Sequence, residues 1–156
     1  MERVNIYIKT SLKWPAQKPA AGMWIIEHVE DNRRPEAKDW SIYREKIREN
    51  ELTLQCIVNA FFLLSRSKVK TGSVTVFTEC EHVLNVMNNH WLPIWKKNGW
   101  RNAKEKMVSN MLLWTRLADL MEPYAVSFTG ESHNYSDYMQ LRVEKEIERR
   151  KDEQSI

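Results

Sequence analysis

The segment VTVFTECEHVLNVMNNHWLPIWKKNGWRNAKEKMVSNMLLWTRL, residues Val74 to Leu117, decides the fold of this chain. Its beginning carries β-branched and aromatic side chains over residues 73–78, a pattern typical of a strand. Thr78 and Glu81 have the spacing of a capping box, which predicts that a helix begins at Glu79. The segment therefore predicts a strand that passes directly into a helix, with the acidic residue Glu79 at the junction.

The second half of the segment is rich in tryptophan and in basic residues. Pro93 and Gly99 bound a short helix, and the residues from Ala103 to Met121 predict a long helix that ends before Pro123. Cations and indoles on one protrusion suit contacts with phosphates and sugars, although the indoles also suit a small hydrophobic cluster. The candidate nucleic-acid-binding residues are Trp91, Trp95, Lys96, Lys97, Trp100, Arg101 and Lys104.

The hydrophobic pattern on either side of this segment predicts the remaining elements. Strands are predicted at residues 4–9, 22–29, 40–47 and 124–129, helices at 50–66 and 136–151, and connections at 11–21, 31–38 and 68–72. Three strands come first, and strands and helices then alternate. This order predicts an α/β protein with a mixed sheet and helices on both of its faces.

Length and composition fit one globular domain, because 156 residues with 42% hydrophobic content are enough for a single core. The net charge of +3 does not by itself indicate nucleic acid, so the clustering of the basic residues matters more. Cys56 and Cys80 are too few for a disulfide framework, and neither a signal segment nor an apolar run of about 18 residues is present. We expect a cytoplasmic protein that does not span a membrane, with a domain at 1–143 and a charged helix end and tail at 144–156.

Three acidic residues lie at the ends of separate predicted elements. Glu51 is near the start of the first helix, Glu79 follows the fourth strand, and Asp137 is near the start of the last helix. Carboxylates that converge at one end of a sheet repel one another unless a cation lies among them. Each acid taken alone also fits the N-terminus of a helix, where the helix dipole stabilises it. Only the set as a whole indicates a site.

Several stretches of the chain resemble the ribonuclease H family of the bacterial type-one kind. The stretch TECEHVLNVMNNHWLPIWKKNGWR is similar to the family's fourth-strand acid, following helix and basic protrusion, and LLWTRL is similar to the helix after it. NELTLQCIVNAFFLL resembles the first helix, VNIYIK the first strand, and FTGESHNYSDYM the last strand and the approach to the final helix.

The resemblance implies a ribonuclease H-like fold, with a five-stranded mixed sheet whose first three strands are antiparallel. It also implies hydrolysis of the RNA strand of an RNA/DNA hybrid with the help of two Mg²⁺ or Mn²⁺ ions. Glu51, Glu79 and Asp137 then correspond to catalytic, metal-binding carboxylates, and His133 is the nearest candidate for the family's mobile histidine. The implied partner is nucleic acid, either an RNA/DNA hybrid or a duplex.

The chain departs from the family pattern at two of these positions. Lys9 occupies the place of the first-strand aspartate, and Glu79 occupies the place of an aspartate. An ammonium at residue 9 repels a divalent ion and pairs with carboxylates instead. We therefore expect Lys9 to act as a resident cation among the acids.

Three interpretations stay open on the sequence. The first is a protein of this fold that binds nucleic acid and hydrolyses hybrids weakly or not at all, with Mg²⁺ or Mn²⁺ as cofactor if it is active and no cofactor otherwise. The second is an active, Mg²⁺-dependent ribonuclease H with an altered site. The third is a protein-interaction module on the same fold. Lys9 and Glu79 favour the first interpretation, and the sequence does not indicate an oligomeric state.

Overall fold

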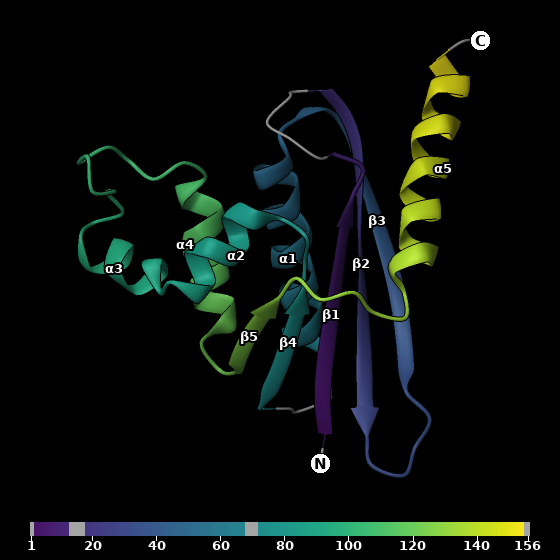
Figure 1. The fold of residues 1–156 in the computed structure, drawn as a ribbon, viewed down its shortest axis with the longest axis horizontal. Helices are drawn as coiled ribbons and strands as arrows, with labels where there is room; N and C mark the ends of the chain where they lie inside the picture. Colours follow the sequence, from purple (N-terminus) through teal and green to yellow (C-terminus); the bar gives the residue numbers. More distant parts are fainter. Residues whose placement is uncertain (1, 13–17, 68–71, 155–156) are drawn as a thin grey trace.

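A five-stranded sheet is the centre of the molecule. The computed structural model describes residues 2–12, 18–67 and 72–154 (Figure 1). The sheet has the order β3-β2-β1-β4-β5, in which β1, β2 and β3 pair antiparallel while β4 is parallel to both β1 and β5. The strands are β1 (Glu2–Thr10), β2 (Lys18–Glu30), β3 (Glu36–Ile47), β4 (Ser73–Phe77) and β5 (Ala125–Thr129). The fold predicted from the sequence, a five-stranded mixed sheet with three antiparallel strands first, is confirmed.

Helices cover both faces of this sheet, as the sequence predicts. One face packs against α1 (Glu49–Arg66), with α2 (Glu81–Asn88) and α4 (Met111–Met121) beside it, and α5 (Ser136–Gln154) covers the other face (Figure 1). The short helix α3 (Trp91–Lys97) lies on a protrusion away from the sheet. Among the described residues, no helix combines the length and the apolar character needed to cross a membrane.

The alternation of side chains along β1 determines which residues reach each face. Val4, Ile6 and Ile8 are buried in the core that α1 covers. Tyr7 points to the opposite face and packs in the smaller core beneath α5. Because side chains alternate along a strand, Lys9 shares the face of Tyr7. The pleat of β1 therefore directs the Lys9 side chain toward the face of the sheet that α5 covers.

Close packing between α1 and the sheet depends on a glycine of β2. A Cβ atom added at Gly22 would lie 2.6 Å from Sγ of Cys56, a distance that real side chains do not adopt. Cys56 is fully buried on the sheet side of α1. The helix can therefore approach β2 at this level only because residue 22 has no side chain.

The predicted long helix at 103–121 is too long, because α4 begins only at Met111. Trp100, Glu105 and Asn110 have left-handed backbone angles, with φ of 64°, 59° and 61°, and such angles interrupt a right-handed helix. The side-chain oxygen of Asn102 accepts hydrogen bonds from the backbone N–H groups of residues 104 and 106, which closes a turn. The residues between Trp100 and Asn110 are therefore an ordered loop.

Smaller differences concern other boundaries. Helix α2 begins at Glu81, two residues later than predicted, because Oγ1 of Thr78 accepts a hydrogen bond from the backbone N–H of Cys80 in a tight turn. Strands β2 and β3 begin earlier than predicted, at Lys18 and Glu36. The middle of the predicted 11–21 loop and most of the predicted turn at 68–72 lie outside the described residues.

The predicted boundary between residues 143 and 144 falls inside α5, which runs without a break to Gln154. The charged half of this helix is tied to the sheet, because the guanidinium of Arg150 lies 4.9 Å from the ring centre of Tyr43 in β3. Arg150 also forms an ion pair of 3.1 Å with Glu146, one turn before it. The C-terminal half of α5 thus contacts β3 through Arg150 and Tyr43.

Candidate functional site

The register of two parallel strands brings Lys9 and Glu79 together. Tyr7 of β1 is the partner of Phe77 of β4, and Lys9 and Glu79 each lie two residues further along the chain. Both side chains therefore emerge at the same end and face of the sheet. Nζ of Lys9 lies 2.7 Å from Oε1 of Glu79, within hydrogen-bonding and ion-pairing distance. The Lys9 side chain is 11% exposed and that of Glu79 is 59% exposed, so the ammonium is the more deeply placed partner.

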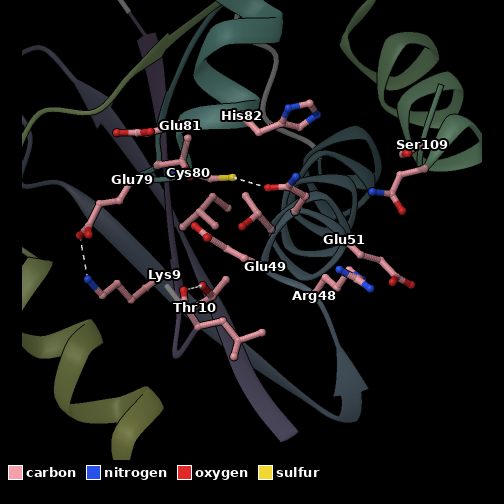
Figure 2. Close-up of a pocket in the computed structure, with 16 residues that line it drawn as sticks. Lys9, Thr10, Arg48, Glu49, Glu51, Glu79, Cys80, Glu81, His82 and Ser109 are labelled. Atoms are coloured by element: carbon pink, nitrogen blue, oxygen red, sulfur yellow. Dashed lines mark hydrogen bonds and ion pairs between the residues drawn. The ribbon is translucent and has the colours of Figure 1, made fainter. Parts of the chain in front are cut away.

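A hollow of about 910 Å³ opens beside this ion pair (Figure 2). Its walls come from the end of β1, the start of α1, the β4–α2 junction, and the residues before α4. The charged residues that line it are Lys9, Arg48, Glu49, Glu51, Glu79 and Glu81. Four carboxylates and two cations therefore share one open pocket. We name this hollow the acidic pocket.

The two carboxylates at the start of α1 point in different directions. Figure 2 shows the Glu49 carboxylate turned toward the strand side of the acidic pocket, where Thr10 lies, and the Glu51 carboxylate turned away from Lys9 and Glu79. Burial is the main cause of the raised pKa of the nearby Cys80 thiol, and the negative charge of Glu49 also raises it. Residues 49 and 51 are about 200° apart around a helix, so only one of them can face the strands.

The sequence analysis selected Glu51 and did not consider Glu49, and both residues line the acidic pocket. Residues four and seven places after Glu49 are Thr53 and Cys56, which are both buried. Leu54 and Val58, three and seven places after Glu51, are buried as well, so this spacing alone does not separate the two acids. The role assigned to Glu51 stays a prediction.

Asp137 and His133 lie on the α5 side of the sheet. Asp137 is exposed in the first turn of α5 and does not line the acidic pocket. The ring of His133 packs against Tyr7 at 4.3 Å and against Phe77 at 5.4 Å between ring centres. Burial lowers the pKa of His133, the carboxylate of Glu79 opposes this, and the ammonium of Lys9 adds to it. His133 is therefore a neutral imidazole near the ion pair at pH 7.

A buried carboxylate next to His133 was not foreseen from the sequence. Glu27 of β2 is 8% exposed and accepts three hydrogen bonds, from Nδ2 of Asn5 at 3.0 Å, from Oη of Tyr7 at 2.8 Å and from Oη of Tyr135 at 2.7 Å. We name these four residues the Glu27 network. The signal that could have found Glu27 is a charged residue in the apolar strand sequence GMWIIEHV, two places after the inward-facing Ile25.

Hydrogen bonding decides the ionisation of the Glu27 network. Burial alone would raise the pKa of Glu27, but the hydrogen bonds from Asn5, Tyr135 and Tyr7 outweigh it and lower the pKa. The hydrogen bond to Glu27 raises the pKa of Tyr135 to about 12, and burial together with Glu27 raises the pKa of Tyr7. The network is therefore one carboxylate with neutral donors at pH 7.

The protrusion presents cations on a framework of tryptophans. Lys96, Lys97, Arg101 and Lys104 are all exposed. Trp95 packs against the buried Trp114 of α4 at 5.9 Å between ring centres, and its backbone oxygen accepts a hydrogen bond of 2.6 Å from the N–H of Trp100. Trp91 lies 6.1 Å from Trp95 and is 38% exposed. Trp95 and Trp100 thus hold the protrusion to the core, and Trp91 presents part of its indole outward.

Comparison with known proteins identifies the family. The family described as RNase H matches residues 1–130, so the chain belongs to the RNase H family. It is 27% identical to a ribonuclease H of Clostridium botulinum over 139 residues, which are 88% of this chain and 89% of that protein. It is also 27% identical to a ribonuclease H of Caldicellulosiruptor saccharolyticus over 128 residues, 82% of this chain and 81% of that protein.

Solved structures show the same fold at low sequence identity. LC9-RNase H1, described as a type 1 RNase H with the type 2 active-site motif, aligns with a TM-score of 0.71 at 15% identity and covers 92% of this chain and 69% of that one. LC11-RNase H1 in complex with an RNA/DNA hybrid aligns with a TM-score of 0.62 at 13% identity, over 92% of this chain and 99% of that one.

The divalent ions that the family implies do not fit the residues of this site. A metal bound by Glu79 would lie next to the Lys9 ammonium, which is already 2.7 Å from that carboxylate. Within residues 2–12, 18–67 and 72–154, no three His, Cys, Asp or Glu side chains gather closely enough to hold a metal ion. Mg²⁺ requires several oxygen ligands, with anionic ones among them. The chemistry of the side chains present is that of an ion pair.

Proposed function

We propose that this chain is a nucleic-acid-binding protein of the RNase H family whose hydrolysis of RNA/DNA hybrids is weak or absent. The observation that carries the proposal is the ion pair between Lys9 and Glu79 at the acidic pocket. The family resemblance places an aspartate where this chain has Lys9. A carboxylate there supports a divalent cation, whereas an ammonium repels it.

The electrostatic change is large compared with the effects of ordinary substitutions. Two unit charges about 4 Å apart interact by roughly 4 kcal/mol at an effective dielectric constant of about 20, and a divalent ion doubles the interaction. Lys9 turns an attraction of this order into a repulsion. The longer side chain of Glu79 also displaces its carboxylate by about 1 Å relative to an aspartate, and such a misplacement alone can cost roughly 10²-fold in rate.

Binding is supported by the protrusion. Its exposed cations Lys96, Lys97, Arg101 and Lys104 lie close together in sequence and next to a partly exposed indole. Cations in such an arrangement contact phosphates without reading the sequence. Each phosphate contact lowers the logarithm of the association constant by about 0.9 per decade of salt. The proposal therefore includes salt-dependent affinity for hybrids and duplexes, with little preference for sequence.

A cleavage assay on a labelled RNA/DNA hybrid tests the catalytic part. The wild-type chain is compared with the Lys9→Asp/Glu79→Asp double variant in Mg²⁺ and in Mn²⁺. We expect little or no cleavage by the wild-type chain and a measurable gain in the double variant, since both substitutions restore the family's residue types. Rapid, metal-dependent cleavage by the wild-type chain would overturn this part of the proposal.

A binding assay tests the other part. We expect the Lys96→Gln/Lys97→Gln variant to lose affinity for hybrid and to show a shallower salt dependence than the wild-type chain. A charge-matched control is Arg142→Gln/Lys145→Gln, which also removes two exposed cations, here from α5 on the opposite side of the sheet. Equal losses in both variants would mean that overall charge, and not the protrusion, governs binding. Absence of binding at low salt would favour a protein-interaction module instead.

A further inference from the structure

We propose that the Lys9 ammonium is a built-in counter-ion that makes nucleic-acid binding at the acidic pocket independent of divalent metal. The inference rests on the proposed function, and it adds an explanation of how a pocket rich in carboxylates can lie next to a bound polyanion. Its basis is the short contact between Nζ of Lys9 and the exposed carboxylate of Glu79.

The loop that carries two cations of the protrusion leads directly into the wall of the acidic pocket. Ser109 and Asn110 line the pocket, and they directly follow the loop that carries Arg101 and Lys104. The inference takes a nucleic-acid backbone bound by those cations to continue toward Ser109 and Asn110 at the acidic pocket. The pocket carries more carboxylates than cations, so its field opposes these phosphates.

Glu79 and Glu81 are the exposed carboxylates of the acidic pocket, and Glu79 is the one that Lys9 contacts. Its side chain is 59% exposed, whereas the Lys9 side chain that contacts it is 11% exposed. The ammonium thus neutralises an outward-facing charge from beneath, without blocking the mouth of the pocket. In a site built only of carboxylates, a bound metal ion is required to supply the same positive charge.

A tethered cation differs from a bound one in its concentration dependence. Mg²⁺ occupies its ligands according to its free concentration, and a chelator removes it. The ammonium of Lys9 is part of the chain and is always present. The affinity of the wild-type chain should therefore be the same with Mg²⁺ as with EDTA, provided that ionic strength is matched.

The test measures fluorescence anisotropy of a labelled RNA/DNA hybrid with four proteins: wild type, Lys9→Met, Lys9→Arg and Lys9→Met/Glu79→Gln. Each is titrated in EDTA and in Mg²⁺ at equal ionic strength, and a denaturing gel then checks that the RNA is intact. Thermal melting of every variant establishes that it is folded. Lys97→Gln is a control variant whose loss of affinity should be equal in the two buffers.

We expect the wild-type dissociation constant to differ by less than about twofold between EDTA and Mg²⁺, and Lys9→Arg to behave in the same way. Lys9→Met should bind about tenfold more weakly in EDTA, which corresponds to about 1.4 kcal/mol, because the positive charge of Lys9 beside Glu79 is lost. The double variant should recover most of this loss, since it removes the carboxylate as well.

Two results would overturn the inference while leaving the proposed function in place. One is wild-type binding that strengthens about tenfold when Mg²⁺ replaces EDTA. The other is a Lys9→Met variant that is folded and binds like the wild-type chain in EDTA. Cleaved RNA on the gel, or no binding by the wild-type chain, would instead overturn the proposed function itself.

Discussion

Replacement of Glu27 by Gln should destabilise the fold by about 2 kcal/mol, because this carboxylate is the centre of a buried network. It accepts hydrogen bonds from Asn5, Tyr7 and Tyr135. A hydrogen bond to a charged acceptor contributes about 1.5–3 kcal/mol, against about 0.5–1.5 kcal/mol for a neutral one, so three weakened bonds cost about 3 kcal/mol. Because Gln is neutral, the variant no longer buries a charge, and this recovers part of the lost stability.

The assay is urea or thermal unfolding of the wild-type and Glu27→Gln chains. A loss of about 2 kcal/mol lowers the melting temperature by roughly 4–8 °C in a chain of this size. Tyr138→Phe is a matched control, since it removes one hydroxyl that donates to Asp39 where both residues are exposed. That substitution should change stability by less than about 0.5 kcal/mol.

The loss should also depend on pH in a defined direction. The pKa of Glu27 is lower in the folded chain than in the unfolded one. The contribution of ionised Glu27 to the stability of the fold is therefore fully present above the unfolded-state pKa, about 4.3 for a glutamate. That contribution is lost as the pH falls through the lower folded-state pKa. The difference between wild type and Glu27→Gln should be constant from pH 7 to about pH 5 and shrink below about pH 4. A difference under about 0.5 kcal/mol at pH 7, or one unchanged at pH 3, would refute this reasoning.

Other substitutions test the packing and the protrusion. Gly22→Ala should destabilise the fold by about 1–3 kcal/mol in urea unfolding, since its Cβ would meet Sγ of Cys56 at 2.6 Å. An unchanged unfolding midpoint would show that α1 can shift away from β2 at little cost in stability. Trp95→Ala should lower the melting temperature and weaken hybrid binding together, because the indole packs on Trp114; binding that is weakened at full stability would mean that the indole contacts nucleic acid directly. Lys97→Gln should weaken binding equally for unrelated sequences and reduce the salt slope by about 0.9; a sequence-dependent loss would argue against a phosphate contact.

The sheet was predictable because alternation along the strands is a strong signal. The odd and even residues of β1 separate into two environments, and the parallel register of Tyr7 with Phe77 brings Lys9 next to Glu79. Once Lys9 was placed at the end of the first strand, its contact with the acid after the fourth strand was expected on charge alone. Lys9 was expected to pair with Glu51, Glu79 and Asp137, and of these contacts the ion pair with Glu79 is present in the structure at 2.7 Å.

The parts that were missed depend on backbone conformations that the sequence signals weakly. Trp100, Glu105 and Asn110 adopt left-handed backbone angles, which residues other than glycine and asparagine rarely adopt, so a helical pattern at 103–110 gave a wrong helix start. The role of Glu51 stays a prediction, and which of Glu49 and Glu51 faces the strands depends on the rotation of α1 about its axis. That rotation is fixed by the packing of Cys56 against Gly22, a contact between distant residues.

Anomalous scattering from a crystal soaked in Mn²⁺ tests the central claim most directly. The claim is that the ammonium of Lys9 occupies the place of a divalent ion beside Glu79. The expected result is a Lys9–Glu79 contact near 2.7 Å with no manganese peak in the acidic pocket. A manganese peak at about 2.0–2.6 Å from the Glu79 carboxylate, with the Lys9 side chain displaced, would contradict it.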